Sequence, residues 1–334
     1  MRLSIALAIP LLLALPRPAA AADPVTLRFA TLAPDGTSWA RELKAAARDL
    51  EAQTHGQVKM KWYFGGIAGD ESAIPDRIRR GQLEGEAAGI TCSTMAPSLK
   101  VLRIAGLFRR RDEAHAIISK LRPRIEAELR KLGYVLLAVQ WFGSDFVFSR
   151  DPVRSVADLR RTKLWTWNLD PVWAVQSKML GLHNVPLSPE EAGRAYDDGR
   201  VDAFLAIPTA ALAFQWSGRA RYYSDVPLAS MAACTFISSQ AFDALPLEAQ
   251  QAVRTVGAKA SIRFEDINAA QEEALLGGLF DRQGLTRVPA SLAFREELLE
   301  QARTVRDALP DAVVTRALVT QVLAWLSDFR AEHP

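Results

Sequence analysis

Apolar and polar residues alternate along the chain after residue 22, and the period then changes to that of a helix. Alternation over 25–34, followed by a turn at 34–36, predicts a strand that leads into a loop. Apolar positions from Trp39 to Leu50 recur at helical spacing, with Ser38 expected as the cap. The segment 58–64 predicts a second strand. Strand, helix and strand in this order indicate a parallel sheet with helices on its faces.

The same alternation of elements continues in two groups, separated by a turn-rich break at 149–152. The expected elements before the break are a helix at 71–80, a strand at 84–91, a helix at 111–132 and a strand at 134–142. Those after it are strand and helix signals at 158–167, 171–180, 188–199, 201–207 and 234–239. Helical periodicity then runs from 245 to 280, long enough to span two lobes, and two amphipathic helices follow at 294–309 and 314–329. The pattern therefore predicts an α/β protein.

Length and composition agree with two lobes of ordinary size. The chain has 334 residues, of which 49% are hydrophobic and 24% charged, and this balance excludes fibrous, disordered and disulfide-scaffold classes. The formal charge of +3 is too small to require nucleic acid as a partner. Cys92 and Cys234 lie in apolar surroundings, so that either a disulfide or two buried thiols is possible.

The N-terminal segment predicts export. Arg2 precedes an apolar run at 3–15, and the small residues at 20–22 match a signal-peptidase site, so we expect cleavage after Ala22. The run is shorter than the roughly 20 residues that a membrane-spanning helix needs. Cleavage removes two arginines and leaves 39 basic against 38 acidic residues, a net charge of +1. We therefore expect a periplasmic protein.

The sequence offers no catalytic or metal-binding motif. Nucleophile-elbow, P-loop and dinucleotide-binding patterns are missing, and none of the four histidines is spaced with a second histidine or a cysteine for zinc. The acidic pairs at 190–191 and 197–198 are typical of solvated helix faces. We expect no enzyme, no catalytic residue, no cofactor and no metal.

Tryptophan is concentrated in one part of the chain. Five of the eight tryptophans lie between Trp141 and Trp216. Trp165 and Trp167 alternate, so both point to one face if their segment is a strand. They could form an apolar wall for a ligand or simply belong to the core, and the residue chemistry alone leaves both interpretations open.

Six motifs in order resemble one family, the extracytoplasmic solute-binding proteins of tripartite ATP-independent periplasmic (TRAP) transporters, also called DctP-like proteins. The motifs lie at 65–83, 101–117, 156–173, 196–216, 220–227 and 242–253. The resemblance implies a two-lobe periplasmic-binding-protein fold with a long helix spanning both lobes, which close on a ligand. Lobe I would comprise 23–145 and about 230–265, and lobe II about 146–229 and 266–334. It also implies a membrane permease as partner.

One position departs from the family pattern. Members of the family carry an arginine after the turn that corresponds to 158–163, where it pairs with a substrate carboxylate. Trp165 stands at that position, and an indole offers one N–H donor and no charge. The pattern of Trp165, Trp167 and Asp170, with the segment 207–216, is similar to a branch that works with a periplasmic tetratricopeptide-repeat protein. For that branch an apolar or lipid-like ligand has been proposed.

These observations predict a binding protein for a largely apolar or amphipathic molecule. The candidate ligand-binding residues are Trp39, Ile90, Thr91, Trp141, Trp165, Trp167, Asp170, Phe204, Pro208 and Trp216. Asp170 could orient a ligand or cap the helix that follows it. One alternative is a conventional organic acid held by another arginine, Arg103, Arg194 or Arg219. The other is a secreted hydrolase or an interaction protein.

Overall fold

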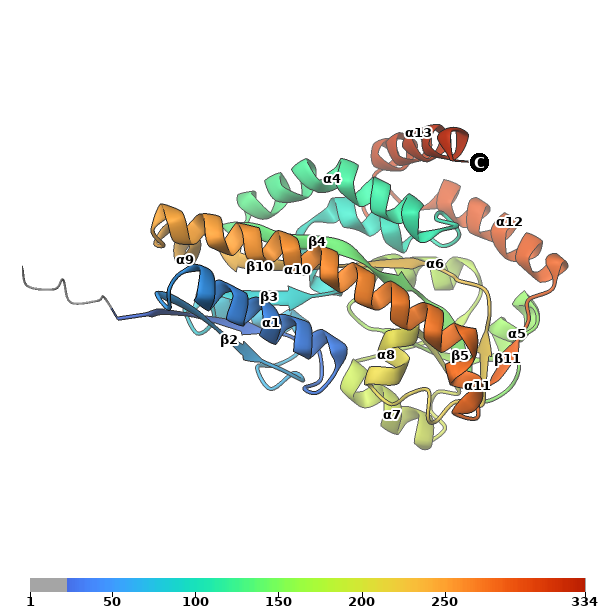
Figure 1. The fold of residues 1–334 in the computed structure, drawn as a ribbon. Coiled ribbons are helices and arrows are strands. Elements are labelled where there is room, and N and C mark those ends of the chain that lie inside the picture. Colours follow the sequence, from blue (N-terminus) through green and yellow to red (C-terminus); the bar gives the residue numbers. More distant parts are fainter. Residues whose placement is uncertain (1–22, 334) are drawn as a thin grey trace, which may run out of the picture.

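The computed structural model describes residues 23–333, so the expected signal peptide lies outside the described residues. Two mixed sheets lie end to end, each with helices on its faces (Figure 1). The first sheet has the strand order β2-β1-β3-β10-β4 and the second the order β11-β9-β5-β8-β6-β7. Among the described residues, no helix is both long and apolar enough to cross a lipid bilayer.

The first sheet is built from strands far apart in the sequence. They are β1 (Val25–Ala30), β2 (Val58–Tyr63), β3 (Gly85–Ala88), β4 (Tyr134–Ser144) and β10 (Ser230–Ser238). Strands β1, β2 and β3 are parallel, whereas β10 runs antiparallel to both β3 and β4. The helices on this side are α1 (Ser38–Gln53), α2 (Ile74–Arg79), α3 (Ile90–Met95), α4 (Arg111–Lys131) and α9 (Ser239–Asp243), with 3₁₀ turns at Glu71–Ala73 and Pro97–Arg103.

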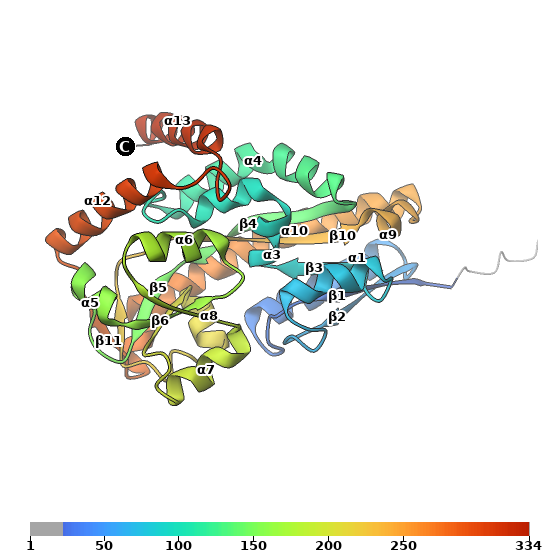
Figure 2. The same cartoon turned by 180° about the vertical axis from the view of Figure 1, so that it is seen from behind.

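The second sheet gathers the remaining strands. They are β5 (Phe146–Ser149), β6 (Lys163–Trp167), β7 (His183–Leu187), β8 (Ala203–Ala206), β9 (Tyr222–Ser224) and β11 (Thr286–Val288). Its helices are α5 (Val156–Arg161), α6 (Pro171–Met179), α7 (Pro189–Asp197) and α8 (Pro208–Ala213). Figure 2 shows α6, α7 and α8 around this sheet, on the side away from the N-terminus.

Two chain segments cross between the sheets at one place. Strand β4 continues into β5 with only Asp145 between them, and the return segment leads from β9 into β10. The two crossings are hydrogen-bonded to each other, since the Asp145 N–H donates to the Ala229 carbonyl and the Leu228 N–H donates to the Asp145 carbonyl. Asp145 therefore lies at the centre of the connection.

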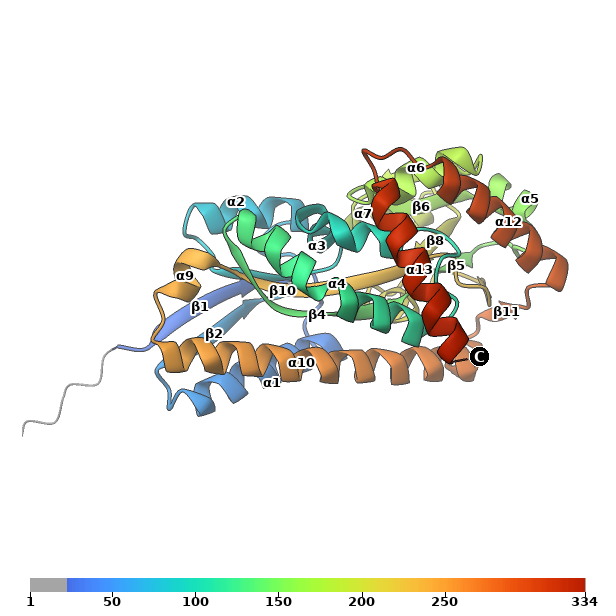
Figure 3. The same ribbon diagram turned by 90° about the horizontal axis from the view of Figure 1, so that it is seen from above.

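A long helix runs the length of the molecule. Helix α10 (Leu247–Ala274) packs on β4 and α1, passes through a π-helical turn at Leu275–Leu279 and ends in α11 (Phe280–Arg282). Figure 3 shows it along both sheets. The expected long helix spanning both lobes is confirmed, with a kink at Gly278, whose φ is 117°.

The last two helices return along the outside of the molecule. Helix α12 (Leu292–Ala308) packs on α5 and α6, while α13 (Arg316–Glu332) packs on α4 (Figure 3). Arg330 of α13 pairs with Glu113 of α4 at 2.8 Å. The two-lobe α/β fold is thus as the sequence predicts, whereas the residue limits of each lobe stay a prediction.

Several local expectations need correction. Helix α1 is capped by Thr37 rather than by Ser38, whose hydroxyl instead donates to Gln271 of α10. The strand expected at 84–91 ends at Ala88, because Ile90 already begins α3. The two cysteines, left open by the sequence, form a disulfide between Cys92 of α3 and Cys234 of β10.

The packing of α10 on β4 depends on a glycine. A Cβ at Gly257 would lie 2.7 Å from the Leu137 carbonyl oxygen of β4, whereas a Cβ at Gly277, in the π-helical turn that follows α10, would meet no atom within 4 Å. Alanine normally stabilises a helix relative to glycine, but at Gly257 the helix must move away from the sheet. We predict that Gly257→Ala lowers the free energy of unfolding by about 1–3 kcal/mol.

Gly277→Ala is the matched control, and it should leave that free energy unchanged or raise it by up to about 1 kcal/mol. Urea unfolding followed by circular dichroism measures both. Equal effects of the two substitutions would contradict the importance of the close approach.

Candidate functional site

A cleft lies between the two sheets, at the ends of their strands. Its empty space amounts to about 1000 Å³, part of it open to solvent. From the first sheet, residues 31–33 follow β1 and residues 87–90 follow or end β3; from the second, residues 165–167 belong to β6 and residues 205–207 to the end of β8. Ligands of open α/β sheets bind at the carboxyl ends of strands, so this position is typical of a binding site.

The cleft is walled by aromatic rings. The aromatic residues that line it are Trp39, Phe142, Trp165, Trp167, Trp173, Phe214, Trp216 and Phe264. Trp216 stacks on Phe214 with ring centroids 5.0 Å apart and packs against Trp165 at 4.7 Å. On the other side, Trp39 packs against Phe142 at 4.9 Å and donates its indole N–H to Asn268 of α10.

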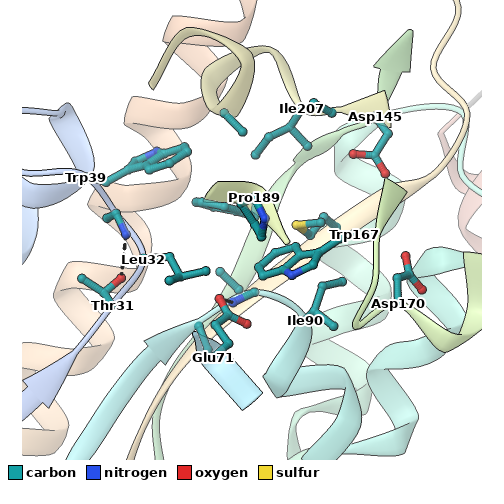
Figure 4. A pocket seen from close by; sticks show the side chains of 18 of the residues that line it. Thr31, Leu32, Trp39, Glu71, Ile90, Asp145, Trp167, Asp170, Pro189 and Ile207 are labelled. Carbon is teal, nitrogen blue, oxygen red and sulfur yellow. Dashed lines mark hydrogen bonds between the residues drawn. The ribbon is translucent and has the colours of Figure 1, made fainter. Parts of the chain in front are cut away.

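The two alternating tryptophans of β6 contact the hydrophobic core and also line the cleft. Trp165 is buried in the core of the second sheet, and Trp167 packs against that core, yet both line the cleft. Figure 4 shows Trp167 among the lining side chains. Neither indole N–H has a hydrogen-bond partner among the described residues. The two interpretations that the sequence left open are therefore compatible.

The structure brings six of the ten candidate residues into the cleft wall. They are Trp39, Ile90, Trp165, Trp167, Asp170 and Trp216. The other four, Thr91, Trp141, Phe204 and Pro208, lie outside the lining.

Thr91 and Pro208 lie in the first turns of α3 and α8, whereas Trp141 and Phe204 are outside the lining because side chains alternate along a strand. Trp141 is buried in the core behind β4, while its neighbours Gln140 and Phe142 face the cleft. Phe204 is buried in the core of the second sheet, while Leu205 reaches the cleft. The sequence pattern located the correct strands and chose the wrong face, because both faces of these strands are apolar.

A buried ion-pair cluster closes one end of the cleft. The Arg103 guanidinium donates from Nη1 to the Asp145 carboxylate at 2.6 Å and from Nε to the Asp170 carboxylate at 2.8 Å. Its Nη1 also donates to the Ser230 carbonyl. All three side chains are at most 5% exposed. Arg103 ends the 3₁₀ turn Pro97–Arg103 on the side of the first sheet, Asp170 follows β6 of the second sheet, and Asp145 lies in the crossing. The cluster therefore joins the two lobes at their connection.

Asp170 has two roles in this cluster. Its Oδ2 accepts the hydrogen bond from Arg103 Nε and forms an ion pair with Nη2 at 2.7 Å, and its Oδ1 accepts the N–H groups of Val172 and Trp173. The expected cap of α6 is therefore confirmed, and no oxygen of Asp170 is left without a partner. The sequence did not indicate its pairing with Arg103, because the two residues are 67 positions apart.

The cluster is electrically unbalanced. Burial disfavours the Arg103 charge, but the two carboxylates raise its pKa above the ordinary value. Burial raises the pKa of Asp145, and the favourable effect of Arg103 does not fully offset it. The arginines proposed as alternative anchors are otherwise engaged. Arg103 is fully paired, and neither Arg194 nor Arg219 lines the cleft.

Glu71 is a second acidic residue of the cleft wall, outside the ion-pair cluster. Its carboxylate accepts the N–H groups of Gly89 and Thr91 at 2.8 and 3.0 Å, which fixes the loop between β3 and α3. Burial nevertheless raises the pKa of Glu71 to about 7. Glu86, directly beneath on β3, is fully buried without a hydrogen-bond partner, and burial raises its pKa well above the ordinary value.

The chain belongs to a known family. Residues 29–309 match the model of bacterial extracellular solute-binding protein, family 7, the DctP family. Its members are extracytoplasmic receptors of TRAP transporters, which bind small molecules in the periplasm for a membrane permease. The protein is thus a TRAP-type solute-binding protein and not an enzyme, and the hydrolase alternative is overturned by this family match.

Relatives and solved structures agree with this assignment. The chain is 24% identical over 233 residues to the 2,3-diketo-L-gulonate-binding periplasmic protein YiaO of Escherichia coli, covering 69% of this chain and 71% of that protein. The galactonate complex of DctPAm from Advenella mimigardefordensis has a TM-score of 0.85 at 17% identity, with 91% and 98% of the two chains covered. DctP7 of Bordetella pertussis, which binds pyroglutamic acid, has a TM-score of 0.81 at 19% identity, with 90% and 99% covered.

The first prediction from the site concerns the buried ion pairs. Arg103→Met removes the only cation of the cluster and leaves two carboxylates buried together. We predict that it lowers the free energy of unfolding by about 3–5 kcal/mol. The control is Arg194→Met, since the side chain of Arg194 is 84% exposed and pairs only at the surface with Asp198; its effect should stay below about 1 kcal/mol. Chemical denaturation measures both, and a small effect of Arg103→Met would contradict the structural role of the cluster.

The second prediction concerns pH. A raised pKa means that the folded state holds a proton more tightly than the unfolded state, so stability is lost as pH rises from about 4.5 through 7. Glu272, whose pKa burial raises to about 7, acts in the same direction. We predict that Glu71→Gln reduces the loss of unfolding free energy between pH 5 and 8 by about 1–3 kcal/mol. Glu126→Gln, on the exposed face of α4, is the control and should leave the loss unchanged.

Proposed function

We propose that this TRAP receptor captures a largely apolar or amphipathic molecule between its two lobes and delivers it to the membrane permease. The observation that carries the proposal is the position of Trp165. It lines the cleft where the resemblance to the family places a carboxylate-binding arginine.

The rest of the lining supports the same conclusion. Eight aromatic side chains line the cleft, and Arg103, the one cation among the described lining residues, is already bound by two carboxylates. Removing about 200 Å² of apolar ligand surface from water is worth roughly 5 kcal/mol before the costs of binding. Shape and apolar contact can therefore replace the charge that an organic acid requires.

The organic-acid alternative keeps support from the similar proteins. YiaO, DctP7 and DctPAm are described as binding 2,3-diketo-L-gulonate, pyroglutamic acid and galactonate, which are all organic acids. Those names describe proteins that are 17–24% identical to this chain. In this cleft an incoming carboxylate would find no unpaired cation among the described lining residues, and this disfavours the alternative.

The working cycle follows from the arrangement of the sheets. We infer that lobe I consists of 23–145 and about 230–265, lobe II of about 146–229 and 266–334, and that they close by a hinge at the crossing. The ligand favours the closed form only through the contacts that it gains there. Export through a signal peptide cleaved after Ala22 and a tetratricopeptide-repeat partner belong to the same proposal.

The bound molecule is the direct test. The protein, purified natively, is extracted with organic solvent and the extract is analysed by mass spectrometry. We predict an apolar or amphipathic molecule at a near-equal molar amount, absent from the double variant Trp165→Ala/Trp167→Ala. Trp325→Ala, on α13 and away from the cleft, is the control and should retain the molecule. A polar organic acid at equal molar amount would contradict the proposal.

A further inference from the structure

Most of the charged side chains in the cleft wall are acidic. The charged side chains among the described lining residues are Arg103, Glu71, Asp145 and Asp170. Arg103 is shared by two aspartates, so this cluster carries one more negative than positive charge. Because all three side chains are at most 5% exposed, water does little to screen the excess charge.

One oxygen atom of the cluster has no partner. Asp145 donates its backbone N–H to Ala229 and pairs through Oδ2 with Arg103, whereas its Oδ1 accepts no hydrogen bond from the described residues. Asp145 is 98% buried, yet it belongs to the cleft lining. In Figure 4 it lies at the same end of the cleft as Asp170, away from Thr31 and Trp39. A carboxylate oxygen in the cleft wall that accepts no hydrogen bond from the described residues is free to accept one from a ligand.

Other titratable groups near Asp145 add to the imbalance. Glu272 of α10 lies behind the crossing, with its Oε2 at 3.4 Å from the Ser144 N–H. Arg111 acts on Glu272 from a half-exposed position and does not line the cleft. Glu71 lines the cleft as well. The surroundings of Asp145 thus contain several carboxyl groups and one shared guanidinium.

The aromatic wall completes a cation site. Faces of tryptophan and phenylalanine rings attract ammonium groups, and aromatic cages with a nearby carboxylate bind quaternary ammonium ions. Here Trp165, Trp167 and Trp173 share the cleft with Asp145 and Asp170. The unpartnered indole N–H groups carry no charge, and a neutral oxygen of a ligand can satisfy them.

We infer that the ligand carries a positively charged head, a protonated amine or a quaternary ammonium group, which binds against Asp145 at the end of the cleft while its apolar part lies along the aromatic wall. The inference rests on the proposed function and names its ligand class. It assigns to Asp145 the role of counter-ion. The cleft would then prefer a cation, whereas receptors for organic acids bind anions.

Matched probes test the inference by calorimetry at low ionic strength. They are octyltrimethylammonium, octanoate and octanol, which share one alkyl chain, and tetramethylammonium, which lacks it. The protein is first stripped of bound molecules by partial unfolding and refolding. We predict that octyltrimethylammonium binds at least roughly tenfold more tightly than either octanoate or octanol.

Two variants of equal charge locate the effect. Asp145→Asn should reduce the preference for octyltrimethylammonium over octanol at least roughly tenfold, and it leaves Arg103 paired with Asp170 alone, so that the cluster becomes neutral. Asp328→Asn removes the same charge from the exposed face of α13 and should keep the preference. Should Asp145→Asn fail to fold, the ranking of the probes on the unaltered protein still decides.

The outcomes separate the inference from the proposed function. Equal or tighter binding of octanol or octanoate overturns the positively charged head and leaves the apolar ligand standing. Binding of tetramethylammonium as tight as that of octyltrimethylammonium supports the head and contradicts the apolar body. Failure of all four probes to bind contradicts both proposals.

Discussion

The buried cluster of Arg103, Asp145 and Asp170 is the interaction on which the arrangement of this receptor depends. Asp145 lies between two strands that belong to different sheets, Asp170 begins α6, and Arg103 ends the 3₁₀ turn that follows α3. A single guanidinium thereby fixes the crossing, the second lobe and the first lobe relative to one another. Charges buried in this way cost free energy to desolvate, and only close pairing with complete hydrogen bonding offsets that cost. Arg103 and Asp170 have this close pairing and hydrogen bonding, whereas Oδ1 of Asp145 accepts no hydrogen bond from the described residues.

That asymmetry connects the architecture of the protein to its ligand. The Arg103 charge is consumed within the fold, so it cannot also serve an incoming anion. Trp165 occupies the strand position where the family resemblance places a cation, and it packs against Trp216 in the wall of the cleft. The protein has the fold of receptors whose structures hold acidic ligands, at TM-scores of 0.80 to 0.85, with sequence identities of only 16–19%. Fold and function are separable in this way because specificity lies in the side chains at the strand ends.

The sequence predicted much of this fold because its signals were local. Periodicity and turn residues located β1, α1, α4 and the long helix, and the order of motifs identified the family. The short strands β7, β9 and β11 carried no such signal, since each depends on a neighbour already in place. The disulfide between Cys92 and Cys234 was equally out of reach, because 142 residues separate the two cysteines.

In the candidate site, too, the residues with a local sequence signal were predicted and the others were not. Trp165, Trp167 and Asp170 were predicted because they are neighbours on one strand and its loop, whereas Glu71 and Asp145 were missed. An acidic residue in a sequence is normally solvated, and nothing local distinguishes Asp145 from the many carboxylates on helix surfaces. Asp145 is enclosed by a second crossing segment that follows it by 83 or more residues, as the hydrogen bonds with Leu228 and Ala229 show. Buried charge is therefore the property that the tertiary structure adds to the sequence, and the proposed preference of the aromatic cleft for a positively charged ligand rests on it.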